Sequence, residues 1–198
     1  MSTLYGSDAM GGVVNIITRK VGDAWHGSVG VDTQLQEDST FGDTRSLQFH
    51  LGGPIARDRL ALTLWGNGFR RDEADVRYTT LAGADVAPIM GANPVAYDNH
   101  GLGARLTLTP SDAHDLWLEG TRNRQAYDNS RGQLGTLGTG GYLPTQRYQR
   151  DQGVLAWTGR FEAGTLDATL TSSRTETIGR TIPPGVAGPG TPRTLAAT

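Results

Sequence analysis

The sequence predicts an all-β fold, the wall of an antiparallel β-barrel that crosses a membrane, and three observations carry that prediction. Apolar and polar residues alternate with a period of two in about seven segments. Short and long connections alternate between these segments. No stretch approaches the roughly 18 consecutive apolar residues of a membrane-spanning helix. Together these observations indicate strands that have a different solvent on each side.

Each strand is expected to be roughly ten residues long, about the length that a tilted strand needs to cross a bilayer. In the first strand, Trp25–Gln36, the residues of one parity are apolar or small and those of the other parity are polar. The same alternation predicts six further strands. Their apolar parity is carried, in chain order, by Leu47, Phe49 and Leu51; Leu60, Leu62 and Leu64; Leu102, Leu106 and Leu108; Leu116 and Leu118; Leu155, Trp157 and Phe161; and Leu166 and Leu170.

The connections between these strands fall into two classes. Short ones are predicted at 53–59, 110–115 and 162–165, and longer ones at 37–43, 72–97, 127–148 and 178–198. Short turns at one end and long loops at the other are typical of outer-membrane barrels. The alternative is a soluble antiparallel β-sandwich, whose strands also alternate but are usually only about five or six residues long.

The composition describes a polar, glycine-rich chain. Of the 198 residues 28 are Gly and 19% are charged, whereas soluble domains average about 7% Gly and about 25% charged residues. The absence of Cys excludes disulfides and Cys-ligated metal sites. A net charge of −2 gives no reason to expect a nucleic-acid partner. Residues 1–5 show no basic or apolar region of a signal peptide.

The N-terminal segment has a different pattern. Gly11 and Gly12 permit a tight bend, and the β-branched run from Val13 to Ile17, interrupted by Asn15, predicts a buried strand. The whole run from Tyr5 to Thr18 resembles the end of the plug domain of TonB-dependent outer-membrane receptors. This resemblance implies a structural role for the residues of the plug-end motif, namely Tyr5, Gly6, Gly11, Gly12, Asn15 and Thr18.

Three later segments resemble the catecholate-siderophore and colicin I receptor branch of this family. They are Trp25–Asp32, Asp58–Leu62 and Phe69–Asp75. The resemblance implies a fragment in which residues 1–20 end the plug domain and residues 21–198 form the first part of a barrel of about 22 strands. It also implies that the short turns are periplasmic and the long loops extracellular.

The resemblance further implies a location and a function. The location is the outer membrane of a Gram-negative bacterium, and the function is energy-coupled uptake of a ferric siderophore. The implied partners are a ferric siderophore or similar chelate, inner-membrane TonB acting through an upstream plug segment, outer-membrane lipid and lipopolysaccharide, and colicins or phages. The alternatives are a passive porin-like or adhesin barrel, and a receptor for cobalamin or haem.

The candidate ligand-binding residues are arginines and tyrosines near the ends of the long loops. Bulky, anionic, aromatic chelates call for guanidinium groups, which bridge oxygen pairs, and for ring faces. The candidates are Arg70, Arg71, Arg77, Tyr78, Arg122, Arg124, Tyr127, Arg131, Tyr142, Arg147 and Tyr148. We expect no catalytic residues, no enzyme activity, no cofactor and no metal site, and we expect Asp112–Asp115 to be a solvated turn.

Overall fold

The fold is one eight-stranded antiparallel β-sheet, with a two-stranded sheet in one of its loops. The computed structural model describes residues 23–86, 95–128, 142–180 and 195–197, so the predicted plug-end segment, residues 1–20, lies outside the described residues. The chain forms β1 (His26–Gln34), β2 (Thr44–Ala56), β3 (Leu60–Arg71), β6 (Ala96–Ser111), β7 (His114–Asp128), β8 (Tyr142–Phe161) and β9 (Gly164–Arg180). A short β10 (Leu195–Ala197) adds to β9, and β4 (Tyr78–Thr79) pairs with β5 (Asp85–Val86) in the β3–β6 loop.

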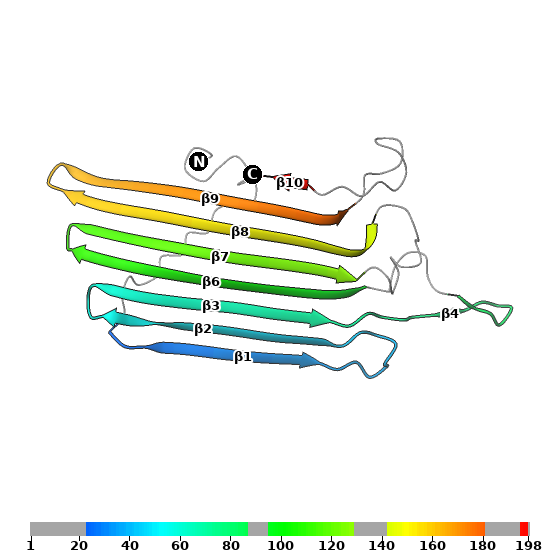
Figure 1. Cartoon of the computed structure of the whole chain (residues 1–198). Coiled ribbons are helices and arrows are strands. Elements are labelled where there is room, and N and C mark those ends of the chain that lie inside the picture. Colours follow the sequence, from blue (N-terminus) through cyan, green and yellow to red (C-terminus); the bar gives the residue numbers. More distant parts are fainter. Residues whose placement is uncertain (1–22, 87–94, 129–141, 181–194, 198) are drawn as a thin grey trace.

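The sheet is a meander. Its order, β1-β2-β3-β6-β7-β8-β9-β10, makes each long strand the hydrogen-bonded neighbour of the next long strand in the sequence, as Figure 1 shows. Turns of two or three residues join β2 to β3, β6 to β7 and β8 to β9 at one end, and the longer loops lie at the other end. The predicted alternation of short and long connections is therefore confirmed.

The seven predicted strands are present, but most of them are longer than the expected ten residues. β6 to β9 run for 15 to 20 residues, and β8 begins at Tyr142, inside the segment predicted as a loop. Pairing continues beyond the apolar segments because a β-ladder needs only backbone partners, which polar residues supply as well as apolar ones.

Three register irregularities interrupt the ladders, and each involves a proline. They lie between Pro54 and Ala56, between Leu108 and Ser111, and between Tyr142 and Arg147. The segments contain Pro54, Pro110 and Pro144, respectively. Proline has no backbone N–H to donate, so a strand can accommodate it at such an irregularity without losing the flanking pairs.

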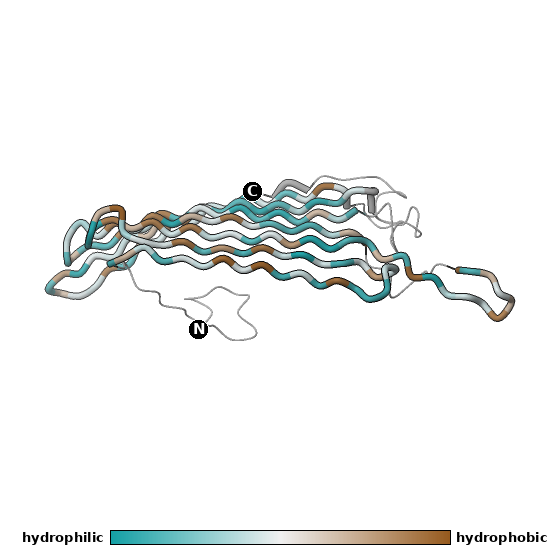
Figure 2. Tube along the Cα trace, turned by 90° about the horizontal axis from the view of Figure 1, so that it is seen from below, coloured by the Kyte–Doolittle hydropathy of each residue, from teal (hydrophilic) through white to brown (hydrophobic). Residues whose placement is uncertain are grey.

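The two faces of the sheet differ in chemistry, and Figure 2 shows the alternation along each strand. The apolar face carries Val29, Val31, Leu47, Phe49, Leu51, Leu62, Leu64, Leu102, Leu106, Leu108, Leu118, Leu155, Leu166 and Leu170. The polar face carries His50, Thr63, Asn67, Arg105, Thr107, Glu119, Thr121, Asn123, Gln125, Gln152 and Thr158. No helix long and apolar enough to cross a membrane occurs among the described residues.

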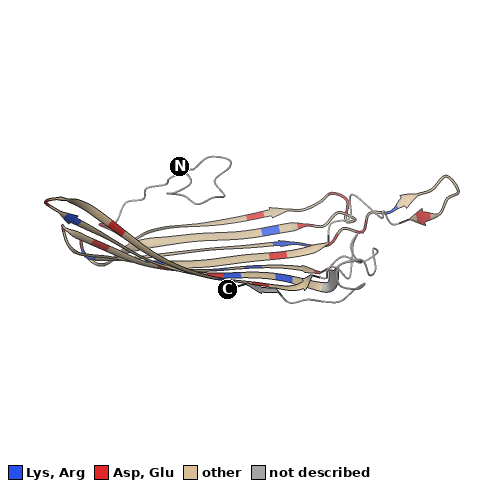
Figure 3. Ribbon diagram, turned by 90° about the horizontal axis from the view of Figure 1, so that it is seen from above, with Lys and Arg blue, Asp and Glu red and all other residues tan. Residues whose placement is uncertain are grey.

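The sheet is one layer thick (Figure 3), and its apolar side chains are exposed. Val29 is 74% exposed, Leu170 is 70% exposed, and no large side chain among the described residues is fully buried. A β-sandwich would bury this face against a second sheet. The soluble sandwich is therefore not the fold, and the exposed apolar face is that of a barrel wall whose solvent is lipid.

Candidate functional site

A hollow of about 1050 Å³ lies against the polar face, in the half near the short turns. Trp65, Arg105, Trp117 and Glu119 are among the residues that line it. Trp65 lies across the ladder from Gly103, where an added Cβ would come within 2.2 Å of the indole ring. Glycine at this position therefore lets the indole lie flat on the neighbouring strand.

An ion pair between neighbouring strands crosses this hollow. Arg105 of β6 and Glu119 of β7 are direct cross-strand neighbours, and the Arg105 Nε donates to Glu119 Oε2 over 2.7 Å. The guanidinium also lies 4.5 Å from the centre of the Trp117 ring. The Glu119 side chain is only 17% exposed, so the pair is partly shielded from water and its attraction is less screened than on an open surface.

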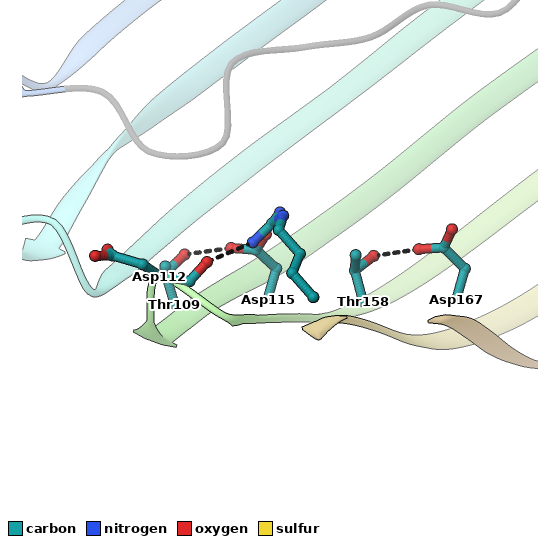
Figure 4. A network of polar contacts seen from close by, with 6 residues as sticks. Thr109, Asp112, Asp115, Thr158 and Asp167 are labelled. Carbon is teal, nitrogen blue, oxygen red and sulfur yellow. Dashed lines mark hydrogen bonds and ion pairs between the residues drawn. The ribbon is translucent and has the colours of Figure 1, made fainter. Parts of the chain in front are cut away.

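A second polar network lies beside the short turns (Figure 4). The Thr109 hydroxyl donates to Asp115 over 3.0 Å, and Arg160 donates to Asp115 and, over 2.8 Å, to the carbonyl of Asp112. The predicted solvated turn at 112–115 is therefore wrong at its last residue. The turn contains only residues 112 and 113, so Asp115 already belongs to β7. Its side chain is buried, and the residue is 7% exposed.

At the loop end of the polar face, four rings form an aromatic ladder across four strands. Phe69 lies 5.8 Å from Tyr97, Tyr97 lies 4.8 Å from Tyr127, and Tyr127 meets Tyr148 edge-on at 6.2 Å. Tilted and edge-on contacts at these separations are the favourable geometries for aromatic pairs. The ladder thus joins β3, β6, β7 and β8 by side chains as well as by backbone.

Arg71 is the cation of this ladder. Its guanidinium carbon lies 5.9 Å from the centre of the Tyr97 ring, and its Nη2 donates to the Val95 carbonyl over 3.2 Å. Its Nε is buried and has no hydrogen-bond partner among the described residues. The ladder therefore combines stacked ring surface with a guanidinium that retains an unused donor.

The predicted ligand-binding residues separate into distinct places. Arg71, Tyr127 and Tyr148 lie on the polar face and belong to or contact the ladder. By strand parity, Arg70, Arg122, Arg124 and Arg147 lie on the opposite face of the sheet. Arg77 and Tyr78 lie in the β3–β6 loop, where Arg77 pairs with Asp75 at 3.3 Å. Arg131 and the Tyr142 side chain lie outside the described residues, as do all six residues of the plug-end motif.

Sequence reasoning missed Tyr97 and Phe69. Tyr97 was assigned to the end of a loop, yet the register places it directly opposite Tyr127 and beside Arg71. A parity count from Leu102 back along the strand assigns Tyr97 to the polar face. Only the pairing of β6 with both of its neighbours brings the rings together.

Among the described residues, no group of three or more His, Asp or Glu side chains is placed to hold an ion. The polar face carries paired ions, hydroxyls and rings, which are groups that can bind and orient a ligand.

Comparison with relatives and solved structures supports the assignment of this sheet to the wall of a barrel. No protein-family model matches the sequence. Over 78 residues the chain is 47% identical to the iron-regulated outer membrane virulence protein of Vibrio cholerae, covering 39% of the chain and 12% of that protein. It is 30% identical over 172 residues to the ferric enterobactin receptor PirA of Pseudomonas aeruginosa, covering 81% of the chain and 22% of that protein.

A solved structure extends the likeness to nearly the whole chain. The siderophore receptor PirA from Acinetobacter baumannii aligns with a TM-score of 0.69 and 25% identity, covering 97% of the chain and 28% of that protein. The chain thus spans less than a third of each of these proteins. These similarities, together with a single-layer meander whose apolar face is exposed, show that the chain belongs to the TonB-dependent outer-membrane receptors, of which it forms part of the barrel wall.

Proposed function

We propose that the receptor containing this chain takes up a ferric siderophore of the catecholate type across the outer membrane, with energy supplied through TonB. The observation that carries the proposal is the aromatic ladder with Arg71 at the loop end of the polar face. Family membership supports the same function, since the P. aeruginosa relative is named a ferric enterobactin receptor.

The chemistry of the cargo suits the ladder. Ferric catecholates are anionic and present aromatic rings, so they gain from ring stacking and from a guanidinium that donates to paired oxygens. The Arg71 guanidinium beside the Tyr97 ring supplies such a cation. The ladder would then form one side of the path that leads the chelate from the loops into the barrel.

The remaining parts of the mechanism extend the proposal. Residues 1–20 would close the plug domain and residues 21–198 would form barrel wall, with TonB acting on an upstream part of the plug. Outer-membrane lipid and lipopolysaccharide would surround the wall, and colicins or phages would use the outer loops. A passive porin-like or adhesin barrel is not favoured, because the named relatives are siderophore receptors. Enzyme activity forms no part of the proposal.

The experiment replaces the ladder in the complete receptor. A Tyr97→Leu/Tyr127→Leu double variant and an Arg71→Gln variant are compared with the native receptor for binding of a ferric catecholate and for growth under iron limitation with that chelate as sole iron source. We expect affinity to fall roughly tenfold in the double variant, since each aromatic contact contributes about 0.5–1.5 kcal/mol.

The matched control is Phe49→Leu, which removes a ring from the apolar face. It should bind and transport like the native receptor. Cobalamin and haem are tested as cargoes in the same strains. Unchanged affinity in both ladder variants would exclude the ladder as a binding surface, and growth supported by haem or cobalamin but by no ferric chelate would reject the siderophore function.

A further inference from the structure

Two histidines come together in the hollow of the polar face. His26 of β1 pairs with Gly52 and His50 of β2 pairs with Ser28, so the two histidines are diagonal neighbours on the same face. Their ring centres are 5.7 Å apart, and the ring planes are inclined by 34°. Both residues are exposed, and both line the hollow. Strand pairing thus places two imidazoles side by side on a surface that solvent and ions can reach.

The two imidazole edges border a common space above Gly52. A Cβ added to Gly52 would lie 3.3 Å from Cε1 and 3.4 Å from Nε2 of His26, and 3.6 Å from Cε1 of His50. Because Cε1 is bonded to both ring nitrogens, each histidine has a nitrogen close to this space. Glycine has no side chain, so the space between the two imidazole edges stays open.

The backbone that precedes β1 favours one tautomer of His26. The Ala24 carbonyl oxygen lies 3.5 Å from His26 Nδ1. A carbonyl only accepts, so the hydrogen bond requires a proton on Nδ1, which leaves the lone pair of Nε2 free. Metal-bound histidines commonly donate their second ring N–H to a backbone carbonyl, which fixes the orientation of the ring. His26 is therefore arranged to bind an ion through Nε2.

The separation of the two rings fits a tetrahedral ion. Zn²⁺ binds imidazole nitrogens at about 2.0–2.1 Å in tetrahedral geometry, so two imidazoles that share one zinc ion have ring centres about 5.2 Å apart. Neighbouring positions of a square-planar ion such as Cu²⁺ would bring the ring centres to about 4.5 Å. The observed 5.7 Å is closer to the tetrahedral value. Water would fill the other two positions, because no third His, Asp or Glu among the described residues is placed to join the pair.

We propose that His26 and His50 bind a Zn²⁺ ion that links β1 to β2. The ion would join the two strands through side chains, in addition to their backbone hydrogen bonds. This site does not depend on siderophore uptake, because it lies on β1 and β2, whereas the aromatic ladder lies on β3, β6, β7 and β8. It replaces the sequence-based expectation that the chain has no metal site.

The test uses the complete receptor in detergent after a chelator has removed bound metal. Calorimetric titration with ZnCl₂ compares the native receptor with His26→Phe and His50→Phe, each of which keeps a ring and removes a nitrogen ligand. The matched control is His100→Ala, which removes a histidine from the opposite face of the sheet. We expect zinc to bind at this site at least roughly tenfold more weakly in each Phe variant, because one imidazole remains. The control should bind zinc like the native receptor.

Thermal unfolding separates metal binding from simple contact between the rings. Zinc should raise the Tm of the native and control receptors more than that of either Phe variant, because an ion that binds only the folded state stabilises it. Mg²⁺, which prefers oxygen ligands, should have no such effect. Heat-modifiable migration verifies that each variant folds.

Three results would overturn the proposal: no zinc binding by the native receptor, equal zinc binding by the native receptor and both Phe variants, or equal binding of Mg²⁺. Contact between the rings alone predicts the second result. Uptake of ferric chelate is assayed separately, so failure of one proposal does not imply failure of the other.

Discussion

Two arginine–carboxylate pairs on the two faces of the sheet have the same chemistry and different surroundings. Arg105 and Glu119 lie on the polar face, where both line the hollow and the guanidinium lies over the Trp117 ring. Arg122 and Asp151 lie on the opposite face, and the Arg122 side chain is 65% exposed. Both pairs join neighbouring strands by short contacts.

The difference lies in what the loss of one partner costs. In a shielded pair next to a ring, removal of one partner leaves a charge unpaired away from water. An exposed pair exchanges partners with solvent and with dissolved anions, so its loss costs little. The same pair of residue types is therefore expected to contribute differently on the two faces.

The largest expected effect comes from placing a charge on each face at mid-depth. Ala168→Arg puts a cation into the lipid-facing band of β9, and the adjacent Thr169→Arg puts the same cation on the polar face. We expect the first to lower the free energy of unfolding by about 2–4 kcal/mol and the second to change it by less than about 1 kcal/mol. Urea titration in lipid vesicles measures both. Equal losses would contradict the assignment of the faces.

The next effect concerns the two ion pairs. Glu119→Ala leaves the Arg105 charge without its partner in a partly shielded position, and we expect a loss of about 1–3 kcal/mol in unfolding free energy. Asp151→Ala, its counterpart on the apolar face, should cost less, because Arg122 is exposed and finds solvent or anions. The two losses in unfolding free energy are measured in one vesicle system, so that their ratio compares the two ion pairs directly. A larger loss for Asp151→Ala than for Glu119→Ala would contradict the expectation.

An effect no larger than that of Glu119→Ala is expected from the aromatic ladder. Tyr97→Leu removes ring contacts to Phe69 and Tyr127, each contributing about 0.5–1.5 kcal/mol beyond area burial. Phe49→Leu removes a ring that has no ring partner among the described residues, so its cost should be near zero. Thermal unfolding of both variants in detergent gives the difference, and a larger loss for Phe49→Leu would show that the ladder contributes no packing of its own.

The smallest effect is expected in the β1–β2 loop, which belongs to neither face of the sheet. In the β1–β2 loop the Thr40 backbone N–H and hydroxyl donate to Asp38, at 2.9 and 2.8 Å, and they hold the pKa of Asp38 below its ordinary value of 3.8. The resulting stabilisation is present above the unfolded pKa and is lost as pH falls through the lowered folded pKa.

Thr40→Ala removes the hydroxyl and keeps the backbone N–H, which is the larger cause of the lowered pKa. The variant should therefore move the pKa of Asp38 only part of the way back toward its ordinary value, without changing the stability of the sheet. Carboxyl-detected NMR titration of the receptor labelled at aspartate follows this shift. An unchanged pKa in the variant would show that the contact from the Thr40 hydroxyl does not form in solution.

The sequence predicted the faces of the sheet well because parity is a local property. Leu102 and Leu106 point to one side whatever their neighbours are, so alternation alone assigned them. The aromatic ladder could not be found in this way. Tyr97 and Tyr127 are far apart in the sequence and meet only because β6 and β7 pair in one register out of several possible ones.

Parity also limits what residue type alone can predict. Arg70 and Arg71 are adjacent arginines at the same strand end, and both were proposed as ligand-binding. They point to opposite faces, so only Arg71 meets the ladder. Their ligand-binding role stays a prediction. Applying the alternation to the loop-end residues would have separated the two arginines without a structure.

The meander has a consequence for how such walls change over evolutionary time. Each long strand bonds only to the strands before and after it in the chain, so a hairpin can be gained, lost or exchanged without rethreading the rest. Removing one alters the circumference by two strands and keeps both ends of the chain on the same side of the membrane, which fits the even strand numbers of bacterial barrels. Pore width can therefore evolve in hairpin steps.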